Sequence, residues 1–382
     1  MMKKAVVLGG GMIGRVVAQD LAQFGESFSV TVFDRSPKAV QEVGAISGVR
    51  AEQADLSQQS ELRRAIQDAD VVVGTLASHL AYAALRTIIE AGKPCVDVAF
   101  MAEDATELDA MARERGLSVV VDCGVAPGVS NALCGYELGR FERLDALRIL
   151  VGGLPLLRRW PYEYKAPFAP ADVLEEYTRP ARYVQNGKVV VREALSEPEL
   201  VDFDVLGTLE AFNTDGLRSL LNLPVPNMIE KTMRYPGHIE LMRVLRHTGF
   251  FSKDSVRLPS GVELSPLELT QHLLFPLWHF EPGEQDITVM RVEAEGVLDG
   301  QAQRVQHDLV DHYDPRLGQT SMGRSTAFPA AIVARWLLDE SLARPGVHPP
   351  EKLAKDSDFW PRLRDELAKR NVKIIESRHP VA

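Results

Sequence analysis

The first fifteen residues contain the pattern that most restricts how this chain can fold. A short apolar run, Ala5–Leu8, leads into a glycine-rich turn and then into helix-forming residues. The turn has the spacing G-x-G-x-x-G, with the glycines at Gly9, Gly11 and Gly14. Such glycines let bare backbone approach a pyrophosphate, and the first helical N–H groups, here Met12 and Ile13, donate to it. The segment therefore predicts a strand, a tight turn and a helix that bind a dinucleotide.

A second apolar run, Phe28–Asp34, ends in an acid 20 residues after Gly14. At this spacing a carboxylate accepts a hydrogen bond from the adenosine ribose and repels a 2′-phosphate, so Asp34 favours NAD over NADP. The adjacent Arg35 would accommodate that phosphate if Asp34 turned away. A purely structural turn with a solvated Asp34 is the alternative, and the complete order of strand, turn, helix, strand and acid argues against it.

Strand and helix patterns continue to about residue 122. Further strands are expected at 48–55, 70–76, 94–98 and 118–122, and helices at 12–24, 57–67, 80–90 and 103–115. Gly25 is expected to end the first helix. The run at 70–76 is apolar on both faces, which is typical of a central parallel strand. We predict an α/β fold in which residues 1–123 form a Rossmann domain with a doubly wound parallel sheet.

The carboxyl ends of these strands are where ligands bind in open α/β sheets. Thr75, Leu76 and Ser78 follow one such strand and are expected to lie along the cofactor and its reaction partner. Asp55 stands where an adenine contact often occurs. An aspartate that caps the next helix is an equal alternative for Asp55.

The pattern changes after about residue 122, where residues 124–131 are expected to open another helix and strand candidates then become more frequent. Alternating apolar and polar residues predict half-exposed antiparallel strands at 147–151, 188–192, 256–258, 286–295 and 303–311. Helices are expected at 239–245 and 267–274. We predict that residues 124–320 form an α+β substrate and dimerisation domain. An apolar helix at 325–338 then begins a C-terminal segment, 321–382, that returns to the Rossmann domain.

The composition excludes several classes of partner. The chain carries 53 acidic and 43 Lys or Arg residues, a net charge of −10, which argues against nucleic acids and anionic membranes. Its three cysteines form no C-x-x-C pattern, so we expect no disulfide framework, no structural zinc site and a reducing cytoplasm. The nine histidines show no ligand spacing such as H-E-x-x-H, so we expect no metal. No apolar run approaches 18 residues, and the N-terminal run is too short for a secretory signal.

Three polar clusters in the second domain are candidates for contact with a small polar substrate. They are Tyr162–Lys165, Glu210–Gly216 and Lys231–His238. Within the last cluster, Arg234 is suited to bind a substrate carboxylate through two parallel hydrogen bonds. The alternative for each cluster is an ordinary polar surface loop.

Several segments together resemble a known family. They are residues 122–128 with Asn131, 152–155, 163–165, 209–212, 231–238 and 324–327. On these segments the chain resembles the saccharopine dehydrogenase/reductase family, most closely its NAD-dependent L-lysine 6-dehydrogenases. The segments extend over nearly the full chain in the expected order.

The resemblance implies a Rossmann domain, an inserted α+β domain that forms a homodimer interface, and a returning C-terminal helix. It implies that Gly11, Met12 and Ile13 bind pyrophosphate, that Asp34 binds ribose, and that Thr75, Val125 and Pro127 contact the nicotinamide end. The residues that it places near the substrate are Ser78, Tyr164, Lys165, Asn213, Thr232, Arg234 and Tyr235. Around Asn213, Thr214 and Asp215 depart from the family pattern.

The activity implied by the resemblance is oxidative deamination of the terminal amine of L-lysine, or of a similar amino acid, in lysine degradation. Hydride passes to NAD, and hydrolysis of the resulting imine releases ammonia and a semialdehyde. The amine must be neutral before it gives up hydride, so a base is required. The candidates are Lys165, Asp122 and His238, with Lys165 ranked first. A structural Lys165 paired with Glu163 is the alternative.

Other functions fit the same motifs. A saccharopine-type enzyme would act on a secondary amine through an imine and would need further arginines, for which Arg158, Arg159, Arg179 and Arg182 are available. An enzyme that acts on a carboxylated polyamine is related to it. A nucleotide-binding regulator without turnover is a third possibility, which would bind ligands without hydride transfer.

Overall fold

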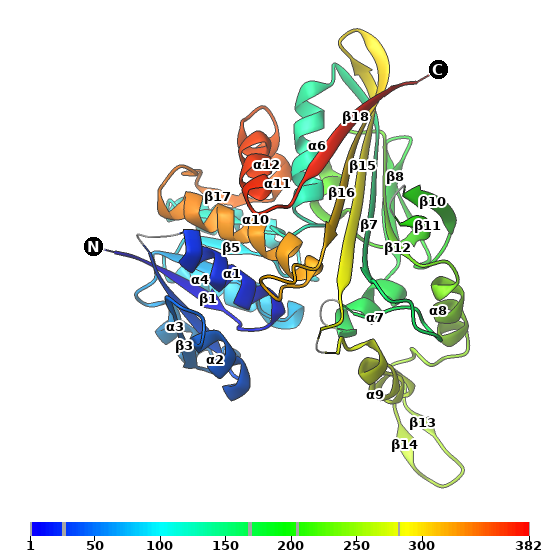
Figure 1. The fold of residues 1–382 in the computed structure, drawn as a ribbon, viewed down its shortest axis with the longest axis horizontal. Helices are drawn as coiled ribbons and strands as arrows, with labels where there is room; N and C mark the ends of the chain where they lie inside the picture. The colour runs from blue at the N-terminus through cyan, green and yellow to red at the C-terminus, as the bar shows by residue number, and fades with distance from the viewer. Residues whose placement is uncertain (1, 25–27, 167–169, 204–205, 282, 382) are drawn as a thin grey trace. The chain divides into compact units, whose positions relative to one another are not determined.

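The computed structural model describes residues 2–24, 28–166, 170–203, 206–281 and 283–381, so Gly25 lies outside the described part of the chain. The chain divides into two units, which are described separately below (Figure 1). The first unit comprises Met1–Arg140 and Gly323–Lys373, and the second comprises Phe141–Met322 and Ile374–Ala382.

The first unit contains a parallel sheet of seven strands in the order β17-β6-β5-β4-β1-β2-β3. Its strands are β1 (Lys3–Leu8), β2 (Phe28–Asp34), β3 (Val49–Gln53), β4 (Val71–Gly74), β5 (Cys95–Asp97), β6 (Ser118–Val120) and β17 (Gly346–His348). The strand order reverses between β1 and β4, which creates the crevice where doubly wound folds bind nucleotides. The predicted Rossmann fold class is confirmed. Sequence analysis missed β17, because this strand lies between Pro345 and Pro349 and has Val347 as its single large apolar residue.

Helices cover this sheet. They are α1 (Met12–Phe24), α2 (Pro37–Gly44), α3 (Gln59–Ile66), α4 (Ser78–Glu90), α5 (Asp109–Glu114), α6 (Val129–Arg140), α10 (Ser321–Leu338), α11 (Pro350–Ala354) and α12 (Phe359–Lys369), with a 3-10 turn, η1, at Ala105–Leu108. Leu62 and Ile66 of α3 and Leu85 of α4 join Leu8 and Val72 of the sheet in one buried core. The apolar stripes of these helices therefore hold the central strands, and with them the strand ends, in place.

The second unit is built on a mixed sheet of nine strands. Its main path runs β10-β11-β12-β7-β15-β16-β18, with β8 paired to β12 and β9 to β8. The strands are β7 (Arg143–Pro155), β8 (Ala181–Gln185), β9 (Lys188–Arg192), β10 (Glu199–Phe203), β11 (Gly207–Asn213), β12 (Asn227–Arg234), β15 (Asp286–Leu298), β16 (Gln301–His312) and β18 (Ile374–Pro380). The other elements are α7 (Pro170–Thr178), a 3-10 turn η2 (Arg218–Asn222), α8 (His238–His247), α9 (Pro266–Trp278) and a hairpin of β13 (Val256–Arg257) and β14 (Glu263–Leu264).

Two of the expected domain boundaries differ from these units. Residues 124–140 cluster with the first unit, because α6 is buried along most of its length and packs against α11. The end of the chain clusters with the second unit, because β18 pairs with β16 from Ile374, opposite Leu309, to Pro380. Neither assignment follows from local composition, because both depend on pairing with distant segments.

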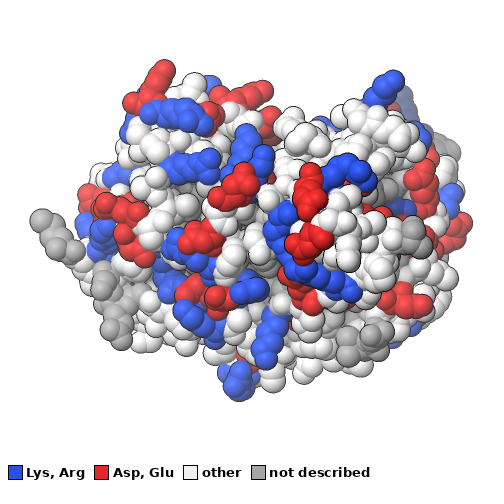
Figure 2. Space-filling model, turned by 90° about the horizontal axis from the view of Figure 1, so that it is seen from above, with Lys and Arg blue, Asp and Glu red and all other residues white. Residues whose placement is uncertain are grey.

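Acidic and basic side chains are mixed on the face drawn in Figure 2, with no broad basic area on it. This distribution fits the net charge of −10. Among the described residues, no helix is long and apolar enough to cross a lipid bilayer.

Candidate active site

The glycines after β1 have different structural roles. Gly9 has a φ of +103°, and a Cβ atom there would lie 2.8 Å from the Thr75 carbonyl oxygen. A Cβ on Gly14 would lie 1.9 Å from the Gly9 carbonyl oxygen, whereas a Cβ on Gly11 would meet no atom within 4 Å. Gly9 and Gly14 therefore permit close packing within the protein, and Gly11 leaves space where the pyrophosphate is expected.

Asp34, at the end of β2, faces this turn. Its two carboxylate oxygens accept hydrogen bonds from the Gly10 N–H and the Ser36 N–H, each at 2.7 Å. Both bonds come from the backbone, so they fix the carboxylate at the carboxyl edge of the sheet. A fixed carboxylate at that edge is the arrangement in which doubly wound folds bind the ribose of a nucleotide.

Asp55 has a local role in the structure. Its exposed carboxylate accepts hydrogen bonds from the Ser57 N–H at 3.1 Å and from the Ser57 hydroxyl at 2.7 Å, and these bonds lower its pKa. They form a turn before α3, whose N-cap residue is Gln58. Asp55 therefore orders the turn and does not cap the helix itself. The adenine contact stays a prediction.

Thr75 joins the ends of β4 and β1. Its hydroxyl donates to the carbonyl oxygens of Leu8 at 2.9 Å and of Gly9 at 3.0 Å. Leu76 is half-buried against the core of the first unit, and Ser78 begins α4. The residues predicted to follow β4 therefore lie at the same sheet edge as the glycine turn.

A buried acid, Asp97, ends the neighbouring strand β5. It is 2% exposed, and burial raises its pKa to about 7, with a further contribution from Asp122. Its carboxylate accepts from the Ala99 N–H at 2.7 Å, and a Cβ on Gly74 would lie 1.8 Å from it. Sequence analysis missed Asp97, although an acid that ends a predicted strand at the carboxyl edge was the available signal.

Val125 and Pro127 lie in a tight turn between β6 and α6. The Gly124 N–H donates to the Pro127 carbonyl oxygen at 3.0 Å, and Gly128 has a φ of +139°. A Cβ at Gly128 would lie 1.9 Å from the Gly124 carbonyl oxygen, so the turn requires glycine there. This turn fixes the backbone that the resemblance places at the nicotinamide.

In the second unit, Arg234 lies in an aromatic cluster of Tyr164, Tyr177, His238 and Trp278. The centroids of the Tyr164 and His238 rings are 4.9 Å apart, and those of Tyr164 and Trp278 are 5.2 Å apart. The Arg234 guanidinium stands 4.6 Å from the Tyr164 ring centroid. Arg234 and His238 are each 3% exposed and Trp278 is fully buried, so the cluster holds a cation in surroundings of low polarity.

The nitrogens of Arg234 differ in how closely they are bonded. Nε donates to the Tyr177 hydroxyl at 3.1 Å, and Nη1 donates to the Met233 carbonyl oxygen at 2.9 Å. Nη2 has longer contacts, 3.5 Å to the Tyr164 hydroxyl and 3.5 Å to the Glu176 carboxylate. Burial raises the Glu176 pKa to about 7, although Arg234 opposes the shift. The Nη2 edge is therefore the most loosely held part of the guanidinium.

Lys165 does not pair with Glu163, which corrects the structural alternative from the sequence. Its Nζ donates to the His279 carbonyl oxygen at 2.6 Å and forms an ion pair with Glu284 at 3.0 Å. Glu163 instead pairs with Arg158. These two partners fix a nearly buried amine on the residue that follows Tyr164 in the chain.

Three other predicted substrate residues are bonded within the second unit. The Tyr235 hydroxyl donates to the Pro155 carbonyl oxygen at 2.9 Å. The Asn213 amide donates to the Ser196 hydroxyl at 3.1 Å and to Glu197 at 3.0 Å. The Thr232 hydroxyl lies 2.7 Å from that of Thr214. These residues do not belong to the aromatic cluster, and their contact with substrate stays a prediction.

Thr214 also connects to a buried acid that sequence analysis missed. Its hydroxyl donates to Glu230 at 2.8 Å, and Glu230 is 5% exposed. Burial raises the Glu230 pKa to about 8. A Cβ on Gly216 would lie 2.4 Å from the Glu230 side chain, so glycine at that position admits the carboxyl group. No local pattern marks this acid, because Lys231 and Arg234 follow it in β12 and make a charged residue in this strand unexceptional.

The arginines that a saccharopine-type enzyme would use are all paired with acids. The pairs are Arg158 with Glu163, Arg159 with Glu284 at 3.2 Å, Arg179 with Glu175 at 3.9 Å, and Arg182 with Asp215 at 2.9 Å through both ends of the guanidinium. Their charges are compensated within the second unit. A substrate carboxylate would have to compete with these acids.

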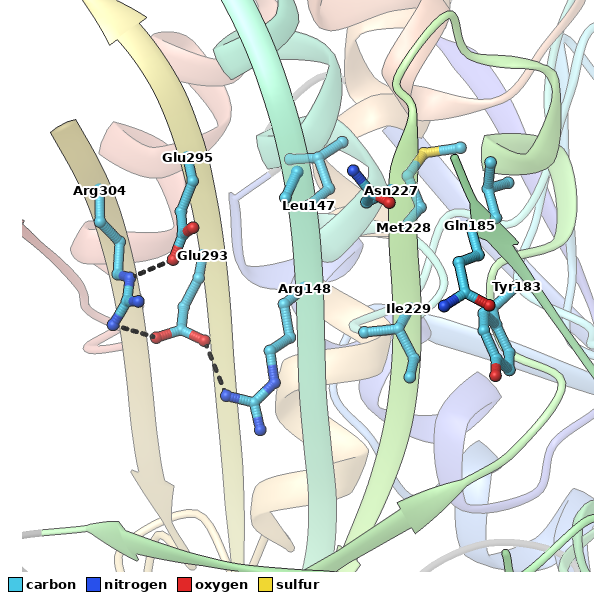
Figure 3. Close-up of a pocket in the computed structure, with 12 residues that line it drawn as sticks. Leu147, Arg148, Tyr183, Gln185, Asn227, Met228, Ile229, Glu293, Glu295 and Arg304 are labelled. Atoms are coloured by element: carbon cyan, nitrogen blue, oxygen red, sulfur yellow. Dashed lines mark hydrogen bonds and ion pairs between the residues drawn. The ribbon is translucent and has the colours of Figure 1, made fainter. Parts of the chain in front are cut away.

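A pocket of about 310 Å³ lies elsewhere in the second unit, on strands β7, β8, β12, β15 and β16 (Figure 3). Figure 3 shows a row of charges across it, in which Glu293 pairs with Arg148 at 3.1 Å and Arg304 pairs with Glu295. None of its lining residues belongs to the aromatic cluster or to the sequence-predicted site. Because the charges neutralise one another, this pocket is a weaker candidate than the surroundings of Arg234.

The glycine turn and Asp34 belong to the first unit, and Arg234 with its aromatic cluster belongs to the second. A glycine turn, a fixed carboxylate and a doubly wound sheet define a nucleotide-binding domain of the kind found in oxidoreductases that use pyridine nucleotides. Residues 5–120 match the family model "Saccharopine dehydrogenase NADP binding domain", and residues 124–372 match "Saccharopine dehydrogenase C-terminal domain". The chain belongs to the saccharopine dehydrogenase family, as its motifs predicted, and the family consists of oxidoreductases.

Curated relatives are distant in sequence. Saccharopine dehydrogenase [NADP(+), L-glutamate-forming] of Saccharomyces cerevisiae is 22% identical over 444 residues, which cover 95% of this chain and 97% of that protein. Mitochondrial alpha-aminoadipic semialdehyde synthase of Bos taurus is 22% identical, over 91% of this chain and 45% of the bovine protein, so the chain spans less than half of that relative. Carboxynorspermidine synthase of Vibrio cholerae is 22% identical, over 64% of this chain and 60% of that protein.

Among solved structures, the apo saccharopine dehydrogenase (L-Glu forming) from Saccharomyces cerevisiae matches with a TM-score of 0.83. The match covers both chains completely at 19% identity, so it demonstrates a shared fold. The comparisons thus support a pyridine-nucleotide-binding domain, and they do not decide between NAD and NADP, since the matching domain model is named for NADP.

Proposed function

We propose that this chain oxidises the amine of an amino acid that carries a single carboxylate, with free L-lysine as the leading substrate. The observation that supports the proposal is how closely each nitrogen of the Arg234 guanidinium is bonded. Its Nε and Nη1 are fixed by near neighbours, while Nη2 has only contacts of 3.5 Å. A substrate carboxylate would find one loosely held guanidinium edge there, whose acidic partner Glu176 stands 3.5 Å away. Arg159 and Arg182, by contrast, are held by acids at 3.2 Å and 2.9 Å.

A saccharopine-type reaction is the second candidate. Its support comes from the comparisons. The match to the yeast relative covers 97% of that protein, which is named as an L-glutamate-forming saccharopine dehydrogenase. A substrate of that class carries several carboxylates and would require some of the paired arginines to exchange partners. The acids around Arg234 and Lys165 make that exchange less favourable than the binding of one carboxylate beside an amine.

In the proposed reaction, residues of the first unit would bind the cofactor and residues of the second would bind the substrate carboxylate. A bound nicotinamide nucleotide supplies the hydride acceptor, and the protein supplies binding, orientation and proton handling. Gly11, Met12 and Ile13 would bind the pyrophosphate, and Asp34 would bind the ribose. Lys165 and Asp122 are the proposed bases for the substrate amine. Before it acts as a base, Lys165 would lose its proton to solvent, because Glu284, its ion-pair partner at 3.0 Å, has a lowered pKa and is a poor proton acceptor.

We further propose NAD as the preferred cofactor. The carboxylate of Asp34 is fixed by the Gly10 and Ser36 N–H groups, and a fixed negative charge at the ribose disfavours a 2′-phosphate. Steady-state kinetics with both cofactors test this, and a preference for NADP of about tenfold or more would overturn it. A homodimer stays a prediction of the family resemblance, to be tested by sedimentation.

The decisive experiment measures reduced cofactor and ammonia in parallel. Purified protein is assayed with NAD and NADP against L-lysine, L-ornithine, saccharopine and polyamines. Turnover of lysine with one ammonia per reduced cofactor supports the first proposal. Turnover of saccharopine with release of an amino acid, and none of lysine, selects the second candidate. Nucleotide binding without any turnover favours a regulator.

A further inference from the structure

A chain of hydrogen bonds runs from Arg234 to the backbone of Tyr162, and its direction can be deduced. His238 Nδ1 lies 2.9 Å from the Tyr162 carbonyl oxygen, which can only accept, so Nδ1 carries a proton. His238 Nε2 lies 2.9 Å from the Tyr177 hydroxyl. In a neutral imidazole the second nitrogen accepts, so Tyr177 donates its proton to Nε2. The Tyr177 oxygen is then the acceptor for Arg234 Nε at 3.1 Å.

The surroundings keep the His238 ring neutral. The ring is buried among Tyr164, Tyr177 and Trp278, and the titratable groups that face it are the two tyrosines and Arg234. Burial and the nearby positive charge lower its pKa to about 3. A second ring proton, on Nε2, would point at the hydrogen that the Tyr177 hydroxyl donates and would break that hydrogen bond. Both ring nitrogens are therefore occupied at neutral pH.

We propose that Tyr177 and His238 are positioning residues, which orient Arg234 so that its Nη2 edge faces the substrate carboxylate. This inference rests on the proposed function, because it assigns the carboxylate to Arg234. Tyr177 fixes Nε, and the Met233 carbonyl oxygen fixes Nη1 at 2.9 Å. Two fixed nitrogens define the plane of a guanidinium, so they also define where Nη2 points.

His238 is a positioning residue in this arrangement, whereas its motif predicted a candidate base. As a candidate base, His238 would need a free nitrogen within reach of the substrate amine. In the structure Nδ1 donates to a carbonyl oxygen and Nε2 accepts from Tyr177. His238 thus acts on the substrate only through Tyr177 and Arg234.

Kinetics of Tyr177→Phe test the positioning role. The variant keeps the ring that packs between Phe212 and Trp278 and loses only the hydroxyl. We expect KM for the carboxylate substrate to rise about tenfold to a hundredfold, the effect of a lost hydrogen bond to a charged group, with kcat within about threefold of the parent. For 1,5-diaminopentane, which is lysine without its carboxylate, the same substitution should leave kcat/KM unchanged.

Tyr183→Phe is the matched control, because Tyr183 lies in β8, on the separate pocket, and outside the aromatic cluster. Thermal melts of both variants exclude a general loss of folding. An unchanged KM for lysine in Tyr177→Phe would overturn the proposal. A fall in kcat with unchanged KM would also overturn it, since that result places the residue in the chemical step.

A second measurement needs no substrate and so separates this inference from the proposed function. NMR of protein labelled with ¹⁵N-histidine reports the tautomer of each ring, and the His238 signals are identified by their loss in His238→Gln. We expect a neutral ring protonated at Nδ1 from about pH 5 to about pH 9. Titration of the His238 ring within that range, or a proton on Nε2, would refute this chain of hydrogen bonds even if lysine were the substrate. The expected spectrum together with inactivity toward lysine would refute only the substrate.

Discussion

The carboxylate of Asp20 and the guanidinium of Arg370 form a bidentate ion pair, although 350 residues separate them in sequence. The distances are 2.6 Å from Nε to Oδ1 and 2.9 Å from Nη2 to Oδ2, and both side chains are 1% exposed. The pair joins α1 to the C-cap residue of α12, within the first unit. It ties the returning C-terminal segment to the helix that follows the glycine turn.

Removal of one partner of this pair should destabilise the first unit strongly. Asp20→Leu leaves a buried guanidinium that keeps only Glu366, at 2.9 Å, as its ionic partner. We expect a loss of about 3–5 kcal/mol in the free energy of unfolding, measured with urea. The double variant Asp20→Leu with Arg370→Met should recover most of that loss, because two apolar side chains leave no buried charge unpaired. Equal stability of the single and double variants would contradict this account.

Alanine at two glycines of the nucleotide turn should affect the melting temperature differently. In Gly14→Ala the new Cβ would stand 1.9 Å from a backbone oxygen, so the turn must distort, and the melting temperature should fall by several degrees. In Gly11→Ala the Cβ meets open space, so the melting temperature should stay within about 2 °C of the parent. Fluorescence titration with NADH should show weaker binding by both. Normal NADH binding by Gly11→Ala would show that the pyrophosphate lies elsewhere.

Glu230 should make the second unit less stable at alkaline pH. Its pKa is about 8 in the folded protein against 4.5 for an ordinary glutamate, so the folded state binds more protons between these values. Stability therefore falls as pH rises from about 4.5 to about 8. Glu230→Gln keeps an acceptor for the Thr214 hydroxyl and removes the titration.

The difference between Glu230→Gln and the parent should grow with pH. We expect a gain on the order of 2–4 kcal/mol for the variant at pH 9 relative to pH 5. Urea unfolding at the two pH values measures it. Thr208→Ala, at the exposed Thr208–Asp202 pair, is a control that should show no such dependence. A constant difference between Glu230→Gln and the parent would argue against a protonated carboxyl.

Substitutions at Lys165 test its proposed role as a base. Lys165→Arg keeps a positive charge beside Glu284, whereas Lys165→Met removes it and leaves Glu284 with Arg159 at 3.2 Å. We expect kcat to fall about 10²-fold to 10⁴-fold in both, since arginine does not give up its proton. Arg159→Met, which removes the other partner of Glu284, should keep kcat near the parent value. Near-normal kcat in Lys165→Arg would indicate that only the charge matters.

Local patterns were sufficient for the nucleotide-binding part of this protein. The strand β1, the glycine turn and Asp34 lie within 34 residues, and the contacts that define them, such as Gly10 N–H to Asp34, form inside that segment. The apolar run around β4 also predicted a central strand correctly, because burial on both faces leaves a continuous apolar signature. The helix expected at 103–115 was divided, because Asp104 caps a 3-10 turn at Thr106 before α5 begins.

The candidate substrate site was only partly predictable. Tyr164, Arg234 and His238 were selected from two motifs, but nothing in the sequence joins them to Glu176 and Tyr177. Those two residues lie in α7, whose pattern also fits an ordinary amphipathic helix.

The sequence by itself therefore determined the fold class, the family and the nucleotide turn. The tertiary structure alone decided the pairing of Asp20 with Arg370, the strands β17 and β18, and the tautomer of His238. The physical reason is that periodicity and turn chemistry act over a few residues, whereas a buried polar group is defined by whichever distant atom meets its hydrogen-bonding requirement.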